Sequence, residues 1–144
     1  MKNLFILTCL SFIFFSCEKT VECQSPRSII ETLNYEITNS SSLAEDDASL
    51  SELYTIIKTI SESETCSEGS SWKFSAYGSK ACGGPIGYIA YSKCINTADF
   101  LNKIAVFTEL QGQYNNKHEV SSTCDVPPPP TSVNCEDDKP VLVY

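Results

Sequence analysis

The chain has few side chains that could carry out acid–base or nucleophilic chemistry. Its one histidine, His118, is the only imidazole that could serve as a base beside a serine or cysteine nucleophile. His118 lies in a polar run, Asn115 to Glu119, that follows the apolar stripe of a predicted helix. Histidine is favoured there because the C-terminal end of a helix carries partial negative charge. The sequence therefore indicates a solvated helix end, and we expect neither enzymatic activity nor a cofactor.

The carboxylates are grouped where solvation accounts for them. Glu45 to Asp47 stand at the start of a predicted helix, where negative charge complements the positive helix end. Glu136 to Asp138 could hold calcium weakly, but they lack the spaced ligands of a dedicated site, and a plain turn is the favoured interpretation. Gly83-Gly84-Pro85 has neither the spacing nor the following helix of a phosphate-binding loop. We expect no metal site.

The N-terminal segment is typical of an export signal. Lys2 precedes the apolar run Leu4 to Phe15, which is too short to span a bilayer but suits the core of a signal peptide. The sequence Phe14-Phe15-Ser16-Cys17 resembles the lipobox of bacterial lipoproteins, in which the cysteine is lipidated and becomes the new N-terminus. We expect residues 1–16 to be removed and Cys17 to anchor the protein to a membrane. An ordinary secretory signal is the alternative.

Export would place the remaining cysteines in an oxidising compartment, where they form disulfides. Metal binding is the alternative, but no two cysteines are three apart and no second histidine is present, so no zinc ligand set is visible. The sequence alone does not choose among the pairings. With Cys9 removed and Cys17 lipidated, the cysteines expected to pair are Cys23, Cys66, Cys82, Cys94, Cys124 and Cys135.

The proline run Pro127-Pro128-Pro129-Pro130 predicts a stiff polyproline II segment, which must stay solvated or dock in an aromatic groove. Flanked by Cys124 and Cys135, it would be a rigid exposed loop, which a direct bond between these two cysteines would close. One interpretation is a spacer that leads the chain back to the sheet. The other is a recognition loop, for example that of a protease inhibitor, because a rigid loop loses little conformational freedom on binding.

Composition and net charge indicate a globular protein that does not bind nucleic acid. Hydrophobic residues make up 42% and charged residues 19% of the 144 residues, a globular balance that excludes a disordered chain, a collagen-like fibre and a coiled coil. The formal net charge is −8 and no basic cluster is present, so nucleic-acid binding is not expected. We expect residues 17–25 to be the lipidated cysteine and a tether, and residues 26–144 to form a single domain.

Two stretches have the periodicity of amphipathic helices. The first runs from about 44 to 60 and the second from about 97 to 116. Asn96 with Asp99 three residues later resembles a capping box and marks the start of the second helix. Residues 26–38 fit a helix face or a strand equally well, although Ser25 before Pro26 favours a helix start.

Alternating residues over 71–77 and strand-forming residues over 86–92 predict an antiparallel hairpin with glycines in its connection. Segments 132–135 and 141–144 predict a C-terminal hairpin, in which Pro140 implies that the second strand begins late or lies at an edge. The expected fold class is α+β, with both helices packed on one face of one small antiparallel sheet and disulfides stapling the domain. The predicted core contains Trp72, Phe74, Tyr88, Ile104 and Phe107.

Several segments resemble a family of small, cysteine-rich secreted lipoproteins of the Bacteroidetes that contain Cys-Gly-Gly-Pro and have no assigned activity. The segments are Trp72-Lys73-Phe74, Gly78 to Pro85, Tyr88 to Ser92, the helix after Thr97, Ser122-Thr123-Cys124 and Pro127 to Cys135. The likeness covers about Cys66 to Tyr144. It implies an exported envelope protein, with two disulfides shared among Cys66, Cys82, Cys124 and Cys135, and Cys23 with Cys94 as a further pair.

These observations together predict a lipoprotein of the cell envelope, anchored to the outer membrane on its periplasmic or surface face. Its partners would be the membrane, through the lipid on Cys17, and another protein. We expect a non-enzymatic binding or structural module. The alternative is a protease inhibitor or recognition protein that presents the loop 124–135.

Overall fold

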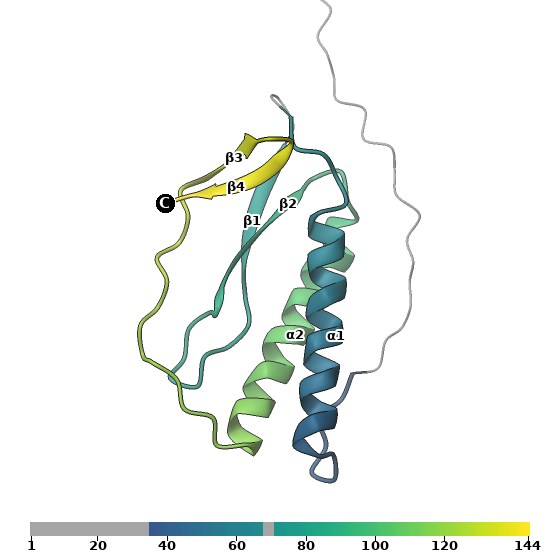
Figure 1. Ribbon diagram of the computed structural model, residues 1–144, viewed down its shortest axis with the longest axis vertical. Coiled ribbons are helices and arrows are strands. Elements are labelled where there is room, and N and C mark those ends of the chain that lie inside the picture. The colour runs from purple at the N-terminus through teal and green to yellow at the C-terminus, as the bar shows by residue number, and fades with distance from the viewer. Residues whose placement is uncertain (1–34, 68–70) are drawn as a thin grey trace, which may run out of the picture.

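The computed structural model describes residues 35–67 and 71–144 and has an α+β fold, as expected (Figure 1). Residues 35–38 are neither helix nor strand. The signal segment 1–16, Cys17, the tether 17–25, Cys23 and most of the ambiguous stretch 26–38 lie outside the described residues. In chain order the elements are α1 (Leu43–Ser61), β1 (Trp72–Tyr77), β2 (Gly87–Ser92), α2 (Thr97–Lys117), β3 (Ser132–Glu136) and β4 (Lys139–Val143).

Both helices begin at side chains that cap them. The Ser42 backbone N–H donates to the Glu45 carboxylate at 2.7 Å, and the Glu45 N–H donates to the Ser42 hydroxyl at 3.3 Å, which completes a capping box. At α2 the Asn96 side chain accepts from the Asp99 N–H at 3.2 Å. These caps satisfy N–H groups that have no partner within the helix, so the two predicted helices are confirmed within one residue at each end.

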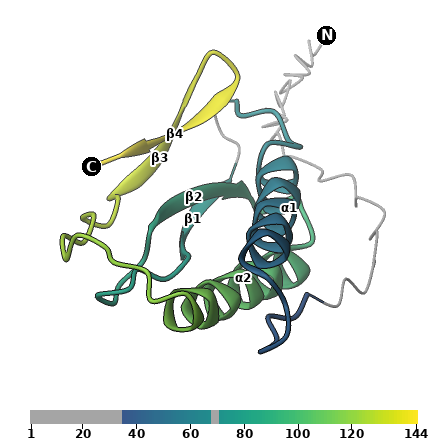
Figure 2. The ribbon, with the colours of Figure 1, turned by 60° about the horizontal axis from the view of Figure 1, so that its bottom comes forward.

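The strands form two separate sheets, and the expected single sheet is therefore wrong. β1 pairs with β2, and β3 pairs with β4, each antiparallel. Figure 2 shows the β3–β4 hairpin on the side of the β1–β2 sheet that faces away from the helices, where β3 contacts β1 and β4 contacts β2. The physical reason is that β2 carries apolar groups on both faces. The helices bury one face, and the hairpin covers the other rather than extending an edge.

The proline in β4 does not delay the strand. β4 begins at Lys139, and Pro140 lies opposite Cys135. The turn between the hairpin strands consists of Asp137 and Asp138, both with positive φ (49° and 61°), as a type I′ turn requires. In such a hairpin the pair next to the turn is hydrogen-bonded and the following pair is not, so the position of Pro140 needs no amide donor. The edge position was predicted, and the late start was wrong.

The main core lies between the helices and the inner face of β2. Phe100 is fully buried, and its ring centroid lies 5.1 Å from that of Tyr91. Ile104 and Phe107 belong to this core, as expected. Trp72, Phe74 and Tyr88 do not. The buried core consists of Leu50, Leu53, Ile57, Tyr91, Ile95, Phe100, Ile104, Phe107 and Leu110.

Strand register explains why three of the predicted core residues are misplaced. Trp72 and Phe74 pair with Ser92 and Ala90, so their side chains share the face opposite to Tyr91. Phe74 meets Tyr88 edge to face on this outer side, at a centroid distance of 6.1 Å. These rings are half-buried. They belong to a second, smaller apolar layer on the side of the sheet where the β3–β4 hairpin lies.

Candidate functional site

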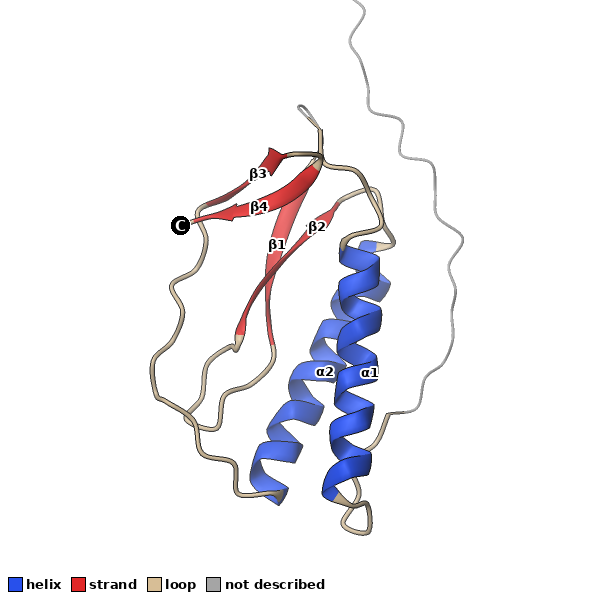
Figure 3. Ribbon diagram, viewed as in Figure 1, coloured by secondary structure: helices blue, strands red, loops and turns tan. Residues whose placement is uncertain are grey.

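The segment that connects α2 to β3, residues 120–131, is the candidate site and is called the strap below. It has no regular structure and runs along the side of the molecule, drawn as a tan loop in Figure 3. The strap begins where Glu119 adopts a positive φ of 50° and the Val120 N–H donates to the Asn115 carbonyl at 3.0 Å. This bond closes the end of α2 and reverses the chain direction. The strap ends at Thr131, whose N–H donates to the Val143 carbonyl at 2.7 Å.

The middle of the strap is fastened to the loop between β1 and β2. Cys124 forms a disulfide with Cys82, with 5.2 Å between their Cα atoms. The Lys80 ammonium donates to the Asp125 carbonyl at 2.5 Å and to its carboxylate at 3.2 Å. The Cys82 N–H also donates to the Ser122 hydroxyl at 3.2 Å. One covalent bond and three hydrogen bonds therefore fix the strap just before its prolines.

The Cys-Gly-Gly-Pro motif has a structural role in this fastening. Gly83 and Gly84 both adopt positive φ values, 91° and 82°, which favour glycine. The Gly83 N–H donates to the Lys80 carbonyl, and the Lys80 N–H donates to the Gly84 carbonyl, each at 2.9 Å. This tight turn presents Cys82 to the strap. A side chain at Gly84 would also lie only 3.0 Å from Val126.

The proline run differs from the expected exposed loop in two respects. Pro128 and Pro129 are exposed and Pro127 is half-buried, but Pro130 is buried, next to Thr131, whose N–H bonds to Val143 of the hairpin. Cys124 does not pair with Cys135, so the loop is not closed on itself. Cys135 pairs with Cys66 instead, with 5.3 Å between Cα atoms.

The expected disulfides are found as far as the described residues extend. Cys66, Cys82, Cys124 and Cys135 form two bonds among themselves. Cys94 is disulfide-bonded as well, and its expected partner, Cys23, lies outside the described residues.

A second polar cluster lies where α1 begins and α2 ends, and it corrects the interpretation of His118. The Asp46 side chain is 1% exposed and accepts hydrogen bonds from the Lys117 ammonium at 2.6 Å, His118 Nε2 at 2.8 Å and the Ser41 hydroxyl at 2.5 Å. His118 is thus a partly buried partner of a carboxylate and not a solvated helix end. Sequence reasoning missed the pair because the two residues are 72 positions apart.

The cluster has the groups of a hydrolytic site but not their arrangement. A nucleophilic serine must reach the imidazole, whereas Ser41 contacts the carboxylate of Asp46. Lys117 also donates to the Thr38 and Ser41 carbonyls, each at 2.6 Å. These contacts tie the segment before α1 to the end of α2, which is a structural role.

Electrostatics in this cluster make the fold sensitive to acid. Burial opposes ionisation of Asp46, but the hydrogen bonds from Lys117, Ser41 and His118 outweigh it and lower its pKa from 3.8 to about 2. A carboxylate whose pKa is lowered in the folded state contributes stability above its unfolded pKa, and this contribution disappears as the pH falls through the folded value. The window for Asp46 therefore runs from about pH 4 down to about pH 2.

We predict that thermal unfolding temperatures measured between pH 5 and pH 2 will fall steeply across this window, and that Asp46→Asn will flatten the dependence. The variant should also be less stable at neutral pH, because the partly buried Lys117 ammonium loses its counter-charge. Asp47→Asn is the matched control, since Asp47 is exposed on the same helix turn. Equal slopes for Asp46→Asn and the unmodified protein would contradict the assignment.

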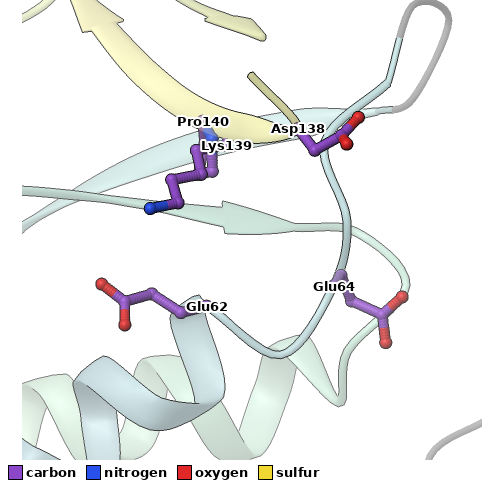
Figure 4. A pocket seen from close by; sticks show the side chains of 5 residues that line it. All are labelled: Glu62, Glu64, Asp138, Lys139 and Pro140. Atoms are coloured by element: carbon purple, nitrogen blue, oxygen red, sulfur yellow. The ribbon is translucent and has the colours of Figure 1, made fainter. Parts of the chain in front are cut away.

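A cavity of about 350 Å³ lies between the end of α1 and the β3–β4 turn, lined by Glu62, Glu64, Asp138, Lys139 and Pro140. Figure 4 shows the three carboxylates pointing in different directions. Within residues 35–67 and 71–144 no group of three histidine, cysteine or acidic side chains is arranged to hold a metal ion. Glu136 to Asp138 stand at the end of β3 and in the turn itself. The cavity therefore offers no convergent set of groups.

No family model, curated protein or solved structure matches this chain. In the part of the chain that the structure describes, neither helix is long and apolar enough to cross a membrane.

Proposed function

We propose that the protein is a cell-envelope lipoprotein, anchored to the outer membrane through lipid on Cys17, and that its domain is a non-enzymatic binding module. In this proposal residues 126–129 of the strap are the recognition element and the partner is another protein. The observation that carries it is an exposed apolar segment with fixed ends. Val126 is 55% exposed and Pro128 and Pro129 are exposed, while Cys124 on one side and Pro130 on the other are held by the fold.

The chemistry of the segment indicates the kind of partner. Consecutive prolines have no amide donors and little conformational freedom, so they bind through ring contacts, and aromatic-lined grooves recognise them. Fixing both ends of such a segment before binding lowers the entropy lost in the complex. The partner would therefore present an aromatic groove. A protease whose substrate groove accepts the strap is the alternative partner.

A non-enzymatic role is supported by the way the reactive groups are used. The His118 imidazole and the Lys117 ammonium are both engaged by Asp46. In the cavity beside the β3–β4 turn the carboxylates diverge (Figure 4). Neither place, among the described residues, holds a nucleophile beside a base.

Substitution in the strap tests the recognition role. We predict that Pro128→Ser with Pro129→Ser will abolish capture of the partner from envelope extract by the full-length protein, while the thermal unfolding temperature shifts by only a few degrees, because both side chains are exposed. A peptide of residues 124–131 should compete with the unmodified protein. Val141→Ser, at an exposed apolar position in β4, is the control and should not affect capture.

Capture that survives both proline substitutions would contradict the recognition role. Inhibition of a protease by the unmodified protein, lost in the proline variant, would favour the inhibitor alternative. The anchor is tested separately, by mass spectrometry of the N-terminal peptide. Lipid on Cys17 is the expected result, and an unmodified peptide spanning Ser16 and Cys17 in most of the mature protein would contradict it.

A further inference from the structure

We propose that the Cys82–Cys124 disulfide is a thiol-exchange site, which a small thiol or the dithiol of a reductase opens well before the Cys66–Cys135 bond. The strap would then have two states, one fastened and one released. This inference goes beyond the recognition role, because it concerns the reactivity of one bond and does not require a partner for the strap.

Access distinguishes the two bonds. Cys82 and Cys124 are both exposed, whereas Cys66 is 1% exposed and Cys135 is half-buried. Exchange requires a thiolate to approach a sulfur in line with the bond that breaks, so burial of the cysteines slows it. The surroundings of Cys82 are also open, since a Cβ added to the neighbouring Gly83 would meet no atom within 4 Å.

Cys66 is further protected by its backbone. Its N–H donates to the Asp138 carbonyl at 3.0 Å, which holds the chain after α1 against the β3–β4 turn. Its partner Cys135 lies on β3 and is paired with Pro140 in the ladder. Attack on the Cys66 sulfur therefore requires local opening of the fold, and only the half-buried Cys135 offers partial access to this bond.

The reductant supplies the two electrons that break the Cys82–Cys124 bond. The attacking thiolate forms a mixed disulfide with one of the two cysteines, and the other leaves as a thiolate that takes up a proton. The second thiol of the reductant then displaces the remaining cysteine. The products are two cysteine thiols in the protein, which has gained two electrons, and a disulfide in the reductant.

Opening the bond should release the strap without unfolding the domain. The strap contributes no residue to the main hydrophobic core, which comes from α1, α2 and the β2 region, and its buried residue, Pro130, lies beyond the disulfide at the end held by Thr131. After reduction its middle would be held only by hydrogen bonds, from Lys80 to Asp125 and from Cys82 to Ser122, and the side chain of Asp125 is 76% exposed. Because the carboxylate of Asp125 lies largely in solvent, its ion pair with Lys80 adds little to this hold.

The test is a timed reduction of the full-length protein with dithiothreitol, with samples alkylated at intervals and each cysteine quantified by mass spectrometry. We expect Cys82 and Cys124 to be labelled together, about tenfold or more faster than Cys66 and Cys135. Far-UV circular dichroism should be unchanged during this first phase. Trypsin cleavage after Lys80, whose side chain is only 16% exposed while it is bonded to Asp125, should accelerate in the same phase.

The control is Cys82→Ser with Cys124→Ser, which should lack the fast phase and label Cys66 and Cys135 at the slow rate. If this variant does not fold, the order of labelling in the unmodified protein still decides the matter. Equal rates for the two bonds, earlier labelling of Cys66 and Cys135, or loss of helix signal during the first phase would overturn the proposal. Failure of the strap to bind a partner would leave the labelling order unaffected, so the two proposals can fail separately.

Discussion

Replacing both Cys66 and Cys135 by alanine is expected to lower the free energy of unfolding by about 4 kcal/mol, a large part of the stability of a small domain. The bond joins positions 69 residues apart, so its loss restores much conformational freedom to the unfolded chain. It also links the chain after α1 to β3, and in the described part of the chain no backbone ladder connects the β3–β4 sheet to the β1–β2 sheet. Urea unfolding followed by circular dichroism measures the change.

The matched control is Cys82→Ala with Cys124→Ala. Its loop has a separation of 42 residues, and because loop entropy varies only with the logarithm of length, the entropic loss should be nearly the same. The additional loss at Cys66 comes from removing a sulfur that is packed at 1% exposure. A smaller loss at Cys66 and Cys135 than at the control pair would contradict this account.

Phe100→Ala is expected to cost about 3–5 kcal/mol, because the ring is fully buried between the helices and β2 and the surrounding side chains cannot fill the space it leaves. Phe74→Ala compares the same change of side chain on the outer face of the sheet. Phe74 is half-buried, so its loss should be clearly smaller, about 1–2 kcal/mol. Both are measured as shifts of the urea midpoint.

The comparison of these two phenylalanines decides which face of the β1–β2 sheet forms the main core. A larger loss for Phe74→Ala than for Phe100→Ala would mean that the outer layer under the β3–β4 hairpin dominates stability. The slope of the denaturation curve should stay constant in both variants, since a changed slope would signal an altered folded or unfolded state rather than a packing defect.

Local patterns were sufficient to predict the helices and the pairing of β1 with β2. The signals for α2 lie within a few residues of each other, in the cap at Asn96 and the apolar stripe that follows. Alternation in β1 also identified correctly that Trp72 and Phe74 share a face. It could not say which face meets the helices, because both faces of this sheet are covered.

The Asp46 cluster and the burial of the strap depend on contacts between segments that are far apart in the sequence, so they were harder to predict. Asp46 has the spacing of an ordinary residue in a first helical turn, and nothing near it in the chain indicates that Lys117 and His118 will bind it. Pro130 belongs to the same proline run as Pro129, yet only Pro130 is buried, next to the Thr131 N–H that bonds to the Val143 carbonyl. Such differences arise from tertiary structure.

The order of the cysteines along the chain has a consequence for how the protein matures. The Cys82–Cys124 bond is nested within the Cys66–Cys135 bond, and Cys94 lies inside both loops. A chain that enters an oxidising compartment from its N-terminus exposes Cys66, Cys82 and Cys94 before either C-terminal partner has arrived. Any bond that Cys66 or Cys82 forms at that stage is not one of the bonds of the folded domain. If the protein is exported as proposed, Cys66 and Cys82 have to stay reduced until Cys124 and Cys135 arrive or be reshuffled afterwards, and we expect the yield of native protein to depend on a disulfide isomerase.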